Sequence, residues 1–119
     1  MNENIFWIVT AKVKEGEIDN LKALISEMTE STLANEPGAV NYEWFISSDE
    51  KFCHLYERYS DSEATVSHLK NFNKNYGKRF IGCLDVKSYT VYGNPSEEII
   101  NMLSPLGVVF MQPAGGFIR

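Results

Sequence analysis

The sequence predicts an α+β domain, in which one antiparallel sheet carries two helices on one of its faces. Short runs rich in β-branched and aromatic residues alternate with segments of helical period, and turn residues separate them. These segments follow the order strand, helix, strand, strand, helix, strand. The 119 residues are enough for one hydrophobic core but not for two, so we expect residues 1–119 to form a single domain.

The first strand and the first helix have different apolar patterns. Ile5–Val13 is apolar at both alternating sets of positions near its start, as in a strand that is covered on both faces. From Glu17 to about Leu33 the apolar residues recur near helical period; they are Ile18, Leu21, Leu24, Ile25, Met28 and Leu33. Glu36-Pro37-Gly38 ends this helix, because proline cannot continue a helix and glycine supplies the turn.

Two strands and a second helix follow. In the second strand, Ala39–Ser47, alternation places four apolar or aromatic residues on one face; they are Val40, Tyr42, Trp44 and Ile46. A short turn leads to a third strand, Phe52–Tyr59, which we expect to pair antiparallel with the second. Leu55, Glu57 and Tyr59 share one of its faces. Asp61 or Ser60 can cap a helix that runs to Phe72 and aligns Ala64, His68 and Phe72.

The remaining core segments complete a split βαβ, ferredoxin-like plan. A short helix is expected within Asn73–Cys83, and a fourth strand over Val86–Tyr92. One sheet with helices on a single face leaves its other face bare. Because the strands carry aromatic residues on both faces, we expect two copies to pack sheet against sheet as a homodimer.

The C-terminal extension, from about residue 95 to residue 119, has no place in a four-stranded plan. A short helix begins at Ser96, and Val108–Met111 is typical of a fifth strand. Pro113 confines that strand to a sheet edge. We expect it to extend the sheet of a partner subunit and so to contribute to the dimer interface.

Composition and spacing exclude several classes of function. The net charge of −5, with no block of basic residues, argues against nucleic acid as a partner. The absence of a long apolar run argues against a membrane span, and the start does not resemble a signal peptide. Cys53 and Cys83 lie far apart without a CxxC pattern, so a cytoplasmic protein with reduced thiols is expected. The spacing indicates no metal site, no dinucleotide fingerprint and no GxSxG nucleophile.

A set of residues spread over most of the chain resembles the antibiotic biosynthesis monooxygenase family, including its small quinol-monooxygenase-like members. The set reads EPG, then YE, then FxxxxExYxDxxAxxxH, and comprises Glu36-Pro37-Gly38, Tyr42-Glu43, Phe52, Glu57, Tyr59, Asp61, Ala64 and His68. The closing GVVFMQPAGGFIR is similar to the tail of longer members. The resemblance implies a dimeric α+β barrel with a pocket between sheet and helices. It also implies oxidation of a small phenolic or quinol-type aromatic by O2, with no cofactor.

The same superfamily leaves two alternatives open. One is a non-catalytic dimer that binds a small molecule or serves in a stress response. The other is a haem-binding or haem-degrading protein. The haem degraders of the superfamily carry an Asn on the first strand and a Trp on the third, whereas this chain has Asn4 only at the strand start and Tyr59 at the third-strand position.

We expect the site where the third strand passes into the second helix. His68 is a buried group that bonds to Glu57 or a tyrosine, or a base or hydrogen-bond donor for a substrate phenol, or a metal or haem ligand. Glu57 must be paired if it is buried, and it could orient His68. Tyr59 would support them. The expected pocket walls are Tyr42, Trp44 and Phe72. A sealed Glu57–His68 pair would favour the binding protein, and an open apolar cavity at His68 the enzyme.

Overall fold

The computed structural model describes residues 2–119 and has the predicted α+β, ferredoxin-like fold. The described chain forms five strands, four α-helices and one 3-10 helix. In order they are β1 (Ile5–Val13), α1 (Ile18–Asn35), β2 (Ala39–Ile46), β3 (Phe52–Tyr59), α2 (Ser62–Asn75), α3 (Gly77–Cys83), β4 (Leu84–Tyr92), α4 (Glu97–Leu103), η1 (Ser104–Leu106) and β5 (Val109–Met111).

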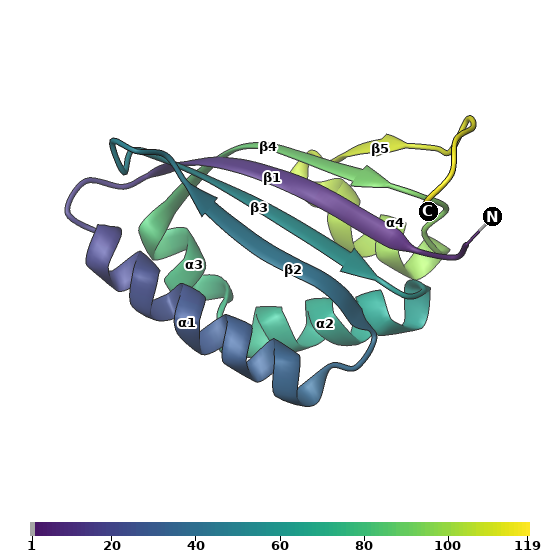
Figure 1. Ribbon diagram of the computed structural model, residues 1–119, viewed down its shortest axis with the longest axis horizontal. Coiled ribbons are helices and arrows are strands. Elements are labelled where there is room, and N and C mark those ends of the chain that lie inside the picture. The colour runs from purple at the N-terminus through teal and green to yellow at the C-terminus, as the bar shows by residue number, and fades with distance from the viewer. Residues whose placement is uncertain (1) are drawn as a thin grey trace.

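The five strands form one sheet in the order β2-β3-β1-β4-β5. The central strand β1 pairs antiparallel with both β3 and β4. Helices α1, α2 and α3 lie on the same side of this sheet (Figure 1). The core fills the space between the two layers, with Trp7 from β1, Leu21 and Met28 from α1, and Tyr59 from β3 almost wholly buried.

The fifth strand pairs with its own chain, not with a partner's sheet as we had expected. β5 runs parallel to β4, with Val109 opposite Thr90 and Met111 opposite Tyr92. A parallel neighbour requires a crossover connection, and α4 with η1 supplies it. The sheet is therefore mixed. The physical reason is that the connection is long enough to return the chain to the free edge of β4.

Two predicted core positions lie at the surface. Val40, expected beside Tyr42, is 54% exposed because the register between β2 and β3 shifts between Ala39 and Asn41. Such a bulge turns the intervening side chain out of the alternation. Leu33 is 85% exposed, and Thr32, four residues after Met28, is buried in its place. Leu33 follows Met28 by five residues, a spacing that turns its side chain away from the buried face of the helix.

The start of α2 has the predicted geometry. Asp61 is the N-cap residue, and its carboxylate accepts a hydrogen bond from the backbone N–H of Ala64 at 2.8 Å. Gly38 packs directly against the same turn, since a Cβ atom there would lie 2.5 Å from the Cβ of Ala64. The lack of a side chain at Gly38 thus allows the end of α1 to approach α2, and Glu36 comes with it.

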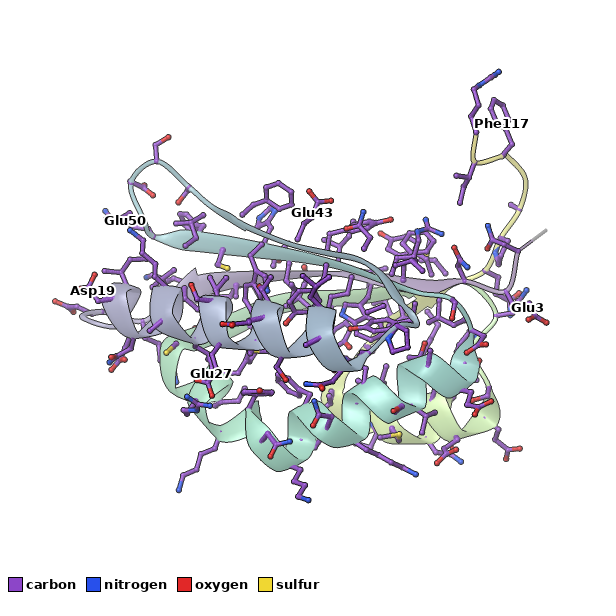
Figure 2. All side chains as sticks on the ribbon, turned by 60° about the horizontal axis from the view of Figure 1, so that its bottom comes forward. Glu3, Asp19, Glu27, Glu43, Glu50 and Phe117 are labelled. Atoms are coloured by element: carbon purple, nitrogen blue, oxygen red, sulfur yellow. The ribbon has the colours of Figure 1, made fainter. Side chains whose placement is uncertain are left out.

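One face of the sheet is uncovered in the single chain. We call it the open face; its apolar members are Phe6, Ile8, Phe45, Phe52, Tyr56, Tyr92, Val109 and Met111. Figure 2 shows Glu43 on this side of the sheet, away from the helices, and Phe117 standing clear of the body at the end of the tail. The first strand is therefore covered on one face only, with Phe6 and Ile8 half-buried on the other.

No helix within residues 2–119 is long and apolar enough to cross a membrane.

Candidate functional site

His68 lies on the buried side of α2, between that helix and the sheet. The residue is only 4% exposed. Its Nδ1 atom lies 2.7 Å from Glu36 Oε1, and its Nε2 atom lies 2.9 Å from Glu57 Oε1. One imidazole therefore bridges two carboxylates, one at the end of α1 and one in the middle of β3.

Glu57 is the most fully bonded member of this group. Trp7 Nε1 donates to Glu57 Oε2 at 2.7 Å, and the Tyr59 hydroxyl donates to Glu57 Oε1 at 2.6 Å. Together with His68, three donors hold a carboxylate that is 4% exposed. A buried charge needs such partners, because an unpaired carboxylate in a low-dielectric interior is very costly. Glu57, Tyr59 and His68 thus come together at the expected place.

Glu36 holds the other side of the imidazole and was not among the expected site residues. Its Oε2 atom accepts a hydrogen bond from Asn71 Nδ2 at 3.3 Å, and its Oε1 atom contacts His68. The side chain of Glu36 is 12% exposed, against 5% for those of His68 and Glu57. The Glu36–His68–Glu57 group is called the carboxylate–imidazole triad below.

The geometry defines the protonation state of the triad. An ionised carboxylate only accepts hydrogen bonds, so with Glu36 and Glu57 both ionised each ring nitrogen of His68 carries a proton. Burial by itself lowers the pKa of His68, but the charges and hydrogen bonds of Glu57 and Glu36 outweigh it and raise that pKa to about 9. A base would need a free lone pair on the ring, and a donor to a substrate would need an N–H that is not already donated to a carboxylate; His68 offers neither in this arrangement, but it supplies positive charge.

Aromatic rings line the side of the triad that faces β2. The ring of Tyr42 lies 6.1 Å from that of His68 and 6.1 Å from that of Trp44. On the helix side, Phe72 lies 6.4 Å from His68. The ring centroid of Phe80, in α3, lies 5.3 Å from that of Phe72 and 6.1 Å from that of Trp44. The three expected pocket walls therefore surround one side of His68, at the edge of the sheet, where Tyr42, Trp44 and Phe72 are only half-buried.

Two hydrogen-bond donors in this aromatic cluster have no partner. In the described part of the chain, three buried side-chain atoms lack a hydrogen bond: Asn41 Oδ1, the Tyr42 hydroxyl oxygen and Trp44 Nε1. Burial raises the pKa of Tyr42, and the nearby charge of Glu57 raises it further, so the phenol is protonated and can donate. The side chains of Trp44 and Thr32 lie close enough to the phenol to act on its pKa in the opposite direction, but neither makes a hydrogen bond of normal geometry with the hydroxyl. Buried polar groups are almost always satisfied, so two adjacent exceptions indicate a place where a ligand oxygen could bind.

Two hollows of the surface lie away from the triad. One, of about 1210 Å³, lies between the N-terminal segment, Arg58 and the C-terminal tail. The other, of about 360 Å³, lies between α1 and α3. Neither is lined by His68 or by Tyr42, Trp44 and Phe72.

Trp7 and Glu36 are the site residues that sequence reasoning missed. Trp7 stands directly opposite Glu57 in the pairing of β1 with β3. The predicted fold makes these strands neighbours, so Trp7 could have been found if the register had been known. The sequence places Glu36 in a helix stop and in the set that resembles the family, but not in the site, because its approach to His68 depends on the packing of α1 against α2.

Comparisons with known proteins agree with the fold and with the predicted family. The family model described as antibiotic biosynthesis monooxygenase matches residues 4–72, which include the whole triad. The structure of MupZ from Pseudomonas fluorescens is similar with a TM-score of 0.85 at 23% identity, over 100% of this chain and 91% of that one. A conserved protein from Methanosarcina mazei has a TM-score of 0.66 at 18% identity, over 75% and 90%.

A further similar structure has a stated activity. It is a variant of SnoaB, a cofactor-independent oxygenase from Streptomyces nogalater, with a TM-score of 0.62 at 13% identity, over 75% of this chain and 90% of that one. At such identities these likenesses concern the fold alone. No curated protein matches the sequence. Because the family model covers more than half of the 119 residues, including Glu36, Glu57 and His68, the chain belongs to the antibiotic biosynthesis monooxygenase family.

Proposed function

We propose that this protein is a cofactor-independent monooxygenase that oxidises a small phenol or quinol with O2. Family membership supports this class, and SnoaB is an oxygenase of that kind on the same fold. The observation that carries the proposal is the pair of unpartnered donors, the Tyr42 hydroxyl and Trp44 Nε1, beside an aromatic wall and a buried imidazolium. A ligand oxygen placed there would satisfy both donors.

The proposed chemistry needs little from the protein. A phenol that has lost its proton is electron-rich and can pass an electron directly to O2. The protein must exclude water, place the ring, and provide donors for the negative oxygen. We propose that Tyr42, Trp44 and Phe72 form the walls, that His68 supplies positive charge beside the substrate oxygen, and that Glu57 and Tyr59 hold His68 in position.

The test is oxygen consumption by the purified, metal-stripped protein with a panel of hydroquinones and phenols, corrected for spontaneous oxidation. Trp44→Phe keeps an aromatic wall but removes one unpartnered donor. Because a single donor to a developing oxyanion is worth a large factor, we expect its rate to fall at least about tenfold. His68→Ala should fall at least as far, since it removes the charge.

Tyr92→Phe is the matched control, because it removes one polar atom on the open face and should leave the rate unchanged. Turnover that is indifferent to both Trp44→Phe and His68→Ala would move the chemistry away from this cluster. If no substrate is consumed, the oxygenase proposal fails.

One observation favours the non-catalytic alternative. Glu57 and His68 contact each other and are both buried, and neither of the two hollows described above is lined by them. A binding protein would bind phenols, seen as quenching of tryptophan fluorescence, without consuming oxygen. The haem alternative has less support, because both ring nitrogens of His68 face carboxylates. In addition, Asn4 bonds to Ser60 and Arg58, not to His68.

We also propose that the protein is a homodimer formed through the open face, with the C-terminal extension at the interface. The carrying observation is the half-exposed apolar sheet, in which Phe45, Val109 and Met111 are each at least 50% exposed. Exposed apolar surface of this extent marks an interaction site.

We also place the protein in the cytoplasm, since Cys53 and Cys83 are buried, unpaired thiols.

Sedimentation velocity tests the dimer. Ile8 lies in the central strand of the open face, so Ile8→Arg would bury two charges at the interface and should yield a monomer. Ile81→Arg places the same charge on the helix layer, where Ile81 is 55% exposed, and should stay dimeric. A monomeric wild-type protein, or a dimeric Ile8→Arg variant, would contradict this interface.

A further inference from the structure

We infer that Glu36, not His68, is the base that takes the proton of the phenolic substrate, and that the substrate's oxygen then binds the unpartnered donors of Tyr42 and Trp44. This inference rests on the proposed function and names a catalytic residue for it. It follows from which atoms of the triad are still able to accept a proton.

His68 has no capacity to accept. Its Nδ1 faces Glu36 Oε1 at 2.7 Å and its Nε2 faces Glu57 Oε1 at 2.9 Å. Both contacts are donated by the ring, because a carboxylate has no proton to give when ionised. An imidazolium with both protons engaged can donate and can supply positive charge, but it cannot remove a proton from a phenol.

Both carboxylate oxygens of Glu57 are likewise occupied by hydrogen bonds. One oxygen accepts from Trp7, and the other accepts from both Tyr59 and His68. Three donors thus occupy its two oxygens, and the residue is 4% exposed. A proton placed on Glu57 would displace at least one of these hydrogen bonds.

Glu36 is the member that remains able to react. Each of its oxygens has a single partner, and the contact to Asn71 is long at 3.3 Å. It is the most exposed of the three side chains. Glu36 and Tyr42 both lie beside the imidazole of His68, with Glu36 Oε1 2.7 Å from Nδ1 and the ring centroid of Tyr42 6.1 Å from that of His68. The Oε2 atom of Glu36 is thus the acceptor that a ligand in the aromatic cluster could reach.

The charges of the triad favour this transfer. Two carboxylates share one imidazolium, so the triad has a net charge of −1, and no lysine or arginine of the described chain forms an ion pair with it. In the proposed step the phenol O–H bond breaks and an O–H bond forms on Glu36. The step is a proton transfer, in which nothing is oxidised or reduced. Glu36 is then neutral, so the imidazolium of His68 forms an ion pair with Glu57 alone. Its positive charge also attracts the phenolate. The total charge of the site is unchanged.

Binding of 4-nitrophenol tests the step without turnover, because its phenolate is yellow and its phenol is not. The experiment uses the full-length protein at a pH where the free compound is protonated. Wild-type protein should generate the phenolate band on binding. Glu36→Gln should bind the compound, seen by fluorescence quenching, and lose the band. Glu43→Gln, on the open face, is the matched control and should behave as wild type.

A second variant keeps the test decisive if Glu36→Gln does not fold. Asn71→Ala leaves the carboxylate in place and removes the hydrogen bond that Asn71 Nδ2 donates to Glu36 Oε2, so that oxygen is free to take the proton. Its phenolate band should be at least as strong as that of the wild type at the same pH, and a weaker band would overturn the inference.

The outcomes separate the two proposals. A band that survives in Glu36→Gln, or a compound that binds wild type without any band, overturns Glu36 as the base and leaves the oxygenase standing. If neither 4-nitrophenol nor any phenol of the panel binds, the aromatic site itself is wrong, and the proposed function fails with the inference.

Discussion

Replacement of Glu57 by alanine should lower the free energy of unfolding by about 3–5 kcal/mol. The change removes one partner of a buried ion pair and leaves the other behind. His68 loses the contact at 2.9 Å, and the Trp7 indole and the Tyr59 hydroxyl lose their acceptor. Each stranded donor is nearly inaccessible to water, because Trp7 is 2% and Tyr59 is 0% exposed. Such donors pay their full desolvation cost when no acceptor is present.

Urea unfolding followed by circular dichroism measures this loss. A small domain has a total stability of about 5–15 kcal/mol, so the variant could be largely unfolded at room temperature. Glu43→Ala is the matched control, since Glu43 is exposed on the neighbouring strand (Figure 2) and its removal should change stability by less than about 0.5 kcal/mol. A Glu57→Ala protein as stable as the control would mean that Glu57 is not buried and paired as described.

Local periodicity predicted much of the fold. Side chains alternate along a strand whatever the strand pairs with, so Leu55, Glu57 and Tyr59 could be placed on one face, and all three are buried. Helical period likewise identified Leu21, Leu24 and Met28 as the buried row of α1. These patterns are properties of a short segment and do not depend on the rest of the chain.

Pairing and packing determined what could not be predicted. The outward position of Val40 depends on a register shift against β3, which nothing in β2 alone announces. The position of β5 depends on which free edge the chain reaches after α4. Trp7 meets Glu57 through the register of β1 with β3. Glu36 meets His68 because α1 ends beside α2, at the close approach of Gly38 to Ala64.

The stability of the protein should fall as the pH rises from 6.5 to 9, and His68 is the cause. Burial opposes its charge, but Glu57 and Glu36 raise its pKa from 6.5 to about 9 in the folded state. Below pH 6.5 both folded and unfolded chains hold the proton, so the stabilisation is fully present. Above it the unfolded chain releases the proton first, and stability falls by about 1.4 kcal/mol for each pH unit. The loss is complete once the pH exceeds the folded pKa, and it amounts to about 3 kcal/mol.

The urea midpoint measured across this pH range tests the prediction, with His68→Gln as the reference because it lacks the titrating group. The wild-type midpoint should fall with pH while that of the variant stays nearly level. The range should end at pH 9, because burial raises the pKa of Cys53 to about 11 and its thiol adds a further loss above that pH. Equal slopes in both proteins would contradict a charged His68. A steeper wild-type slope would show that the imidazolium stabilises the fold, which is the state in which only a carboxylate of the triad can act as the base.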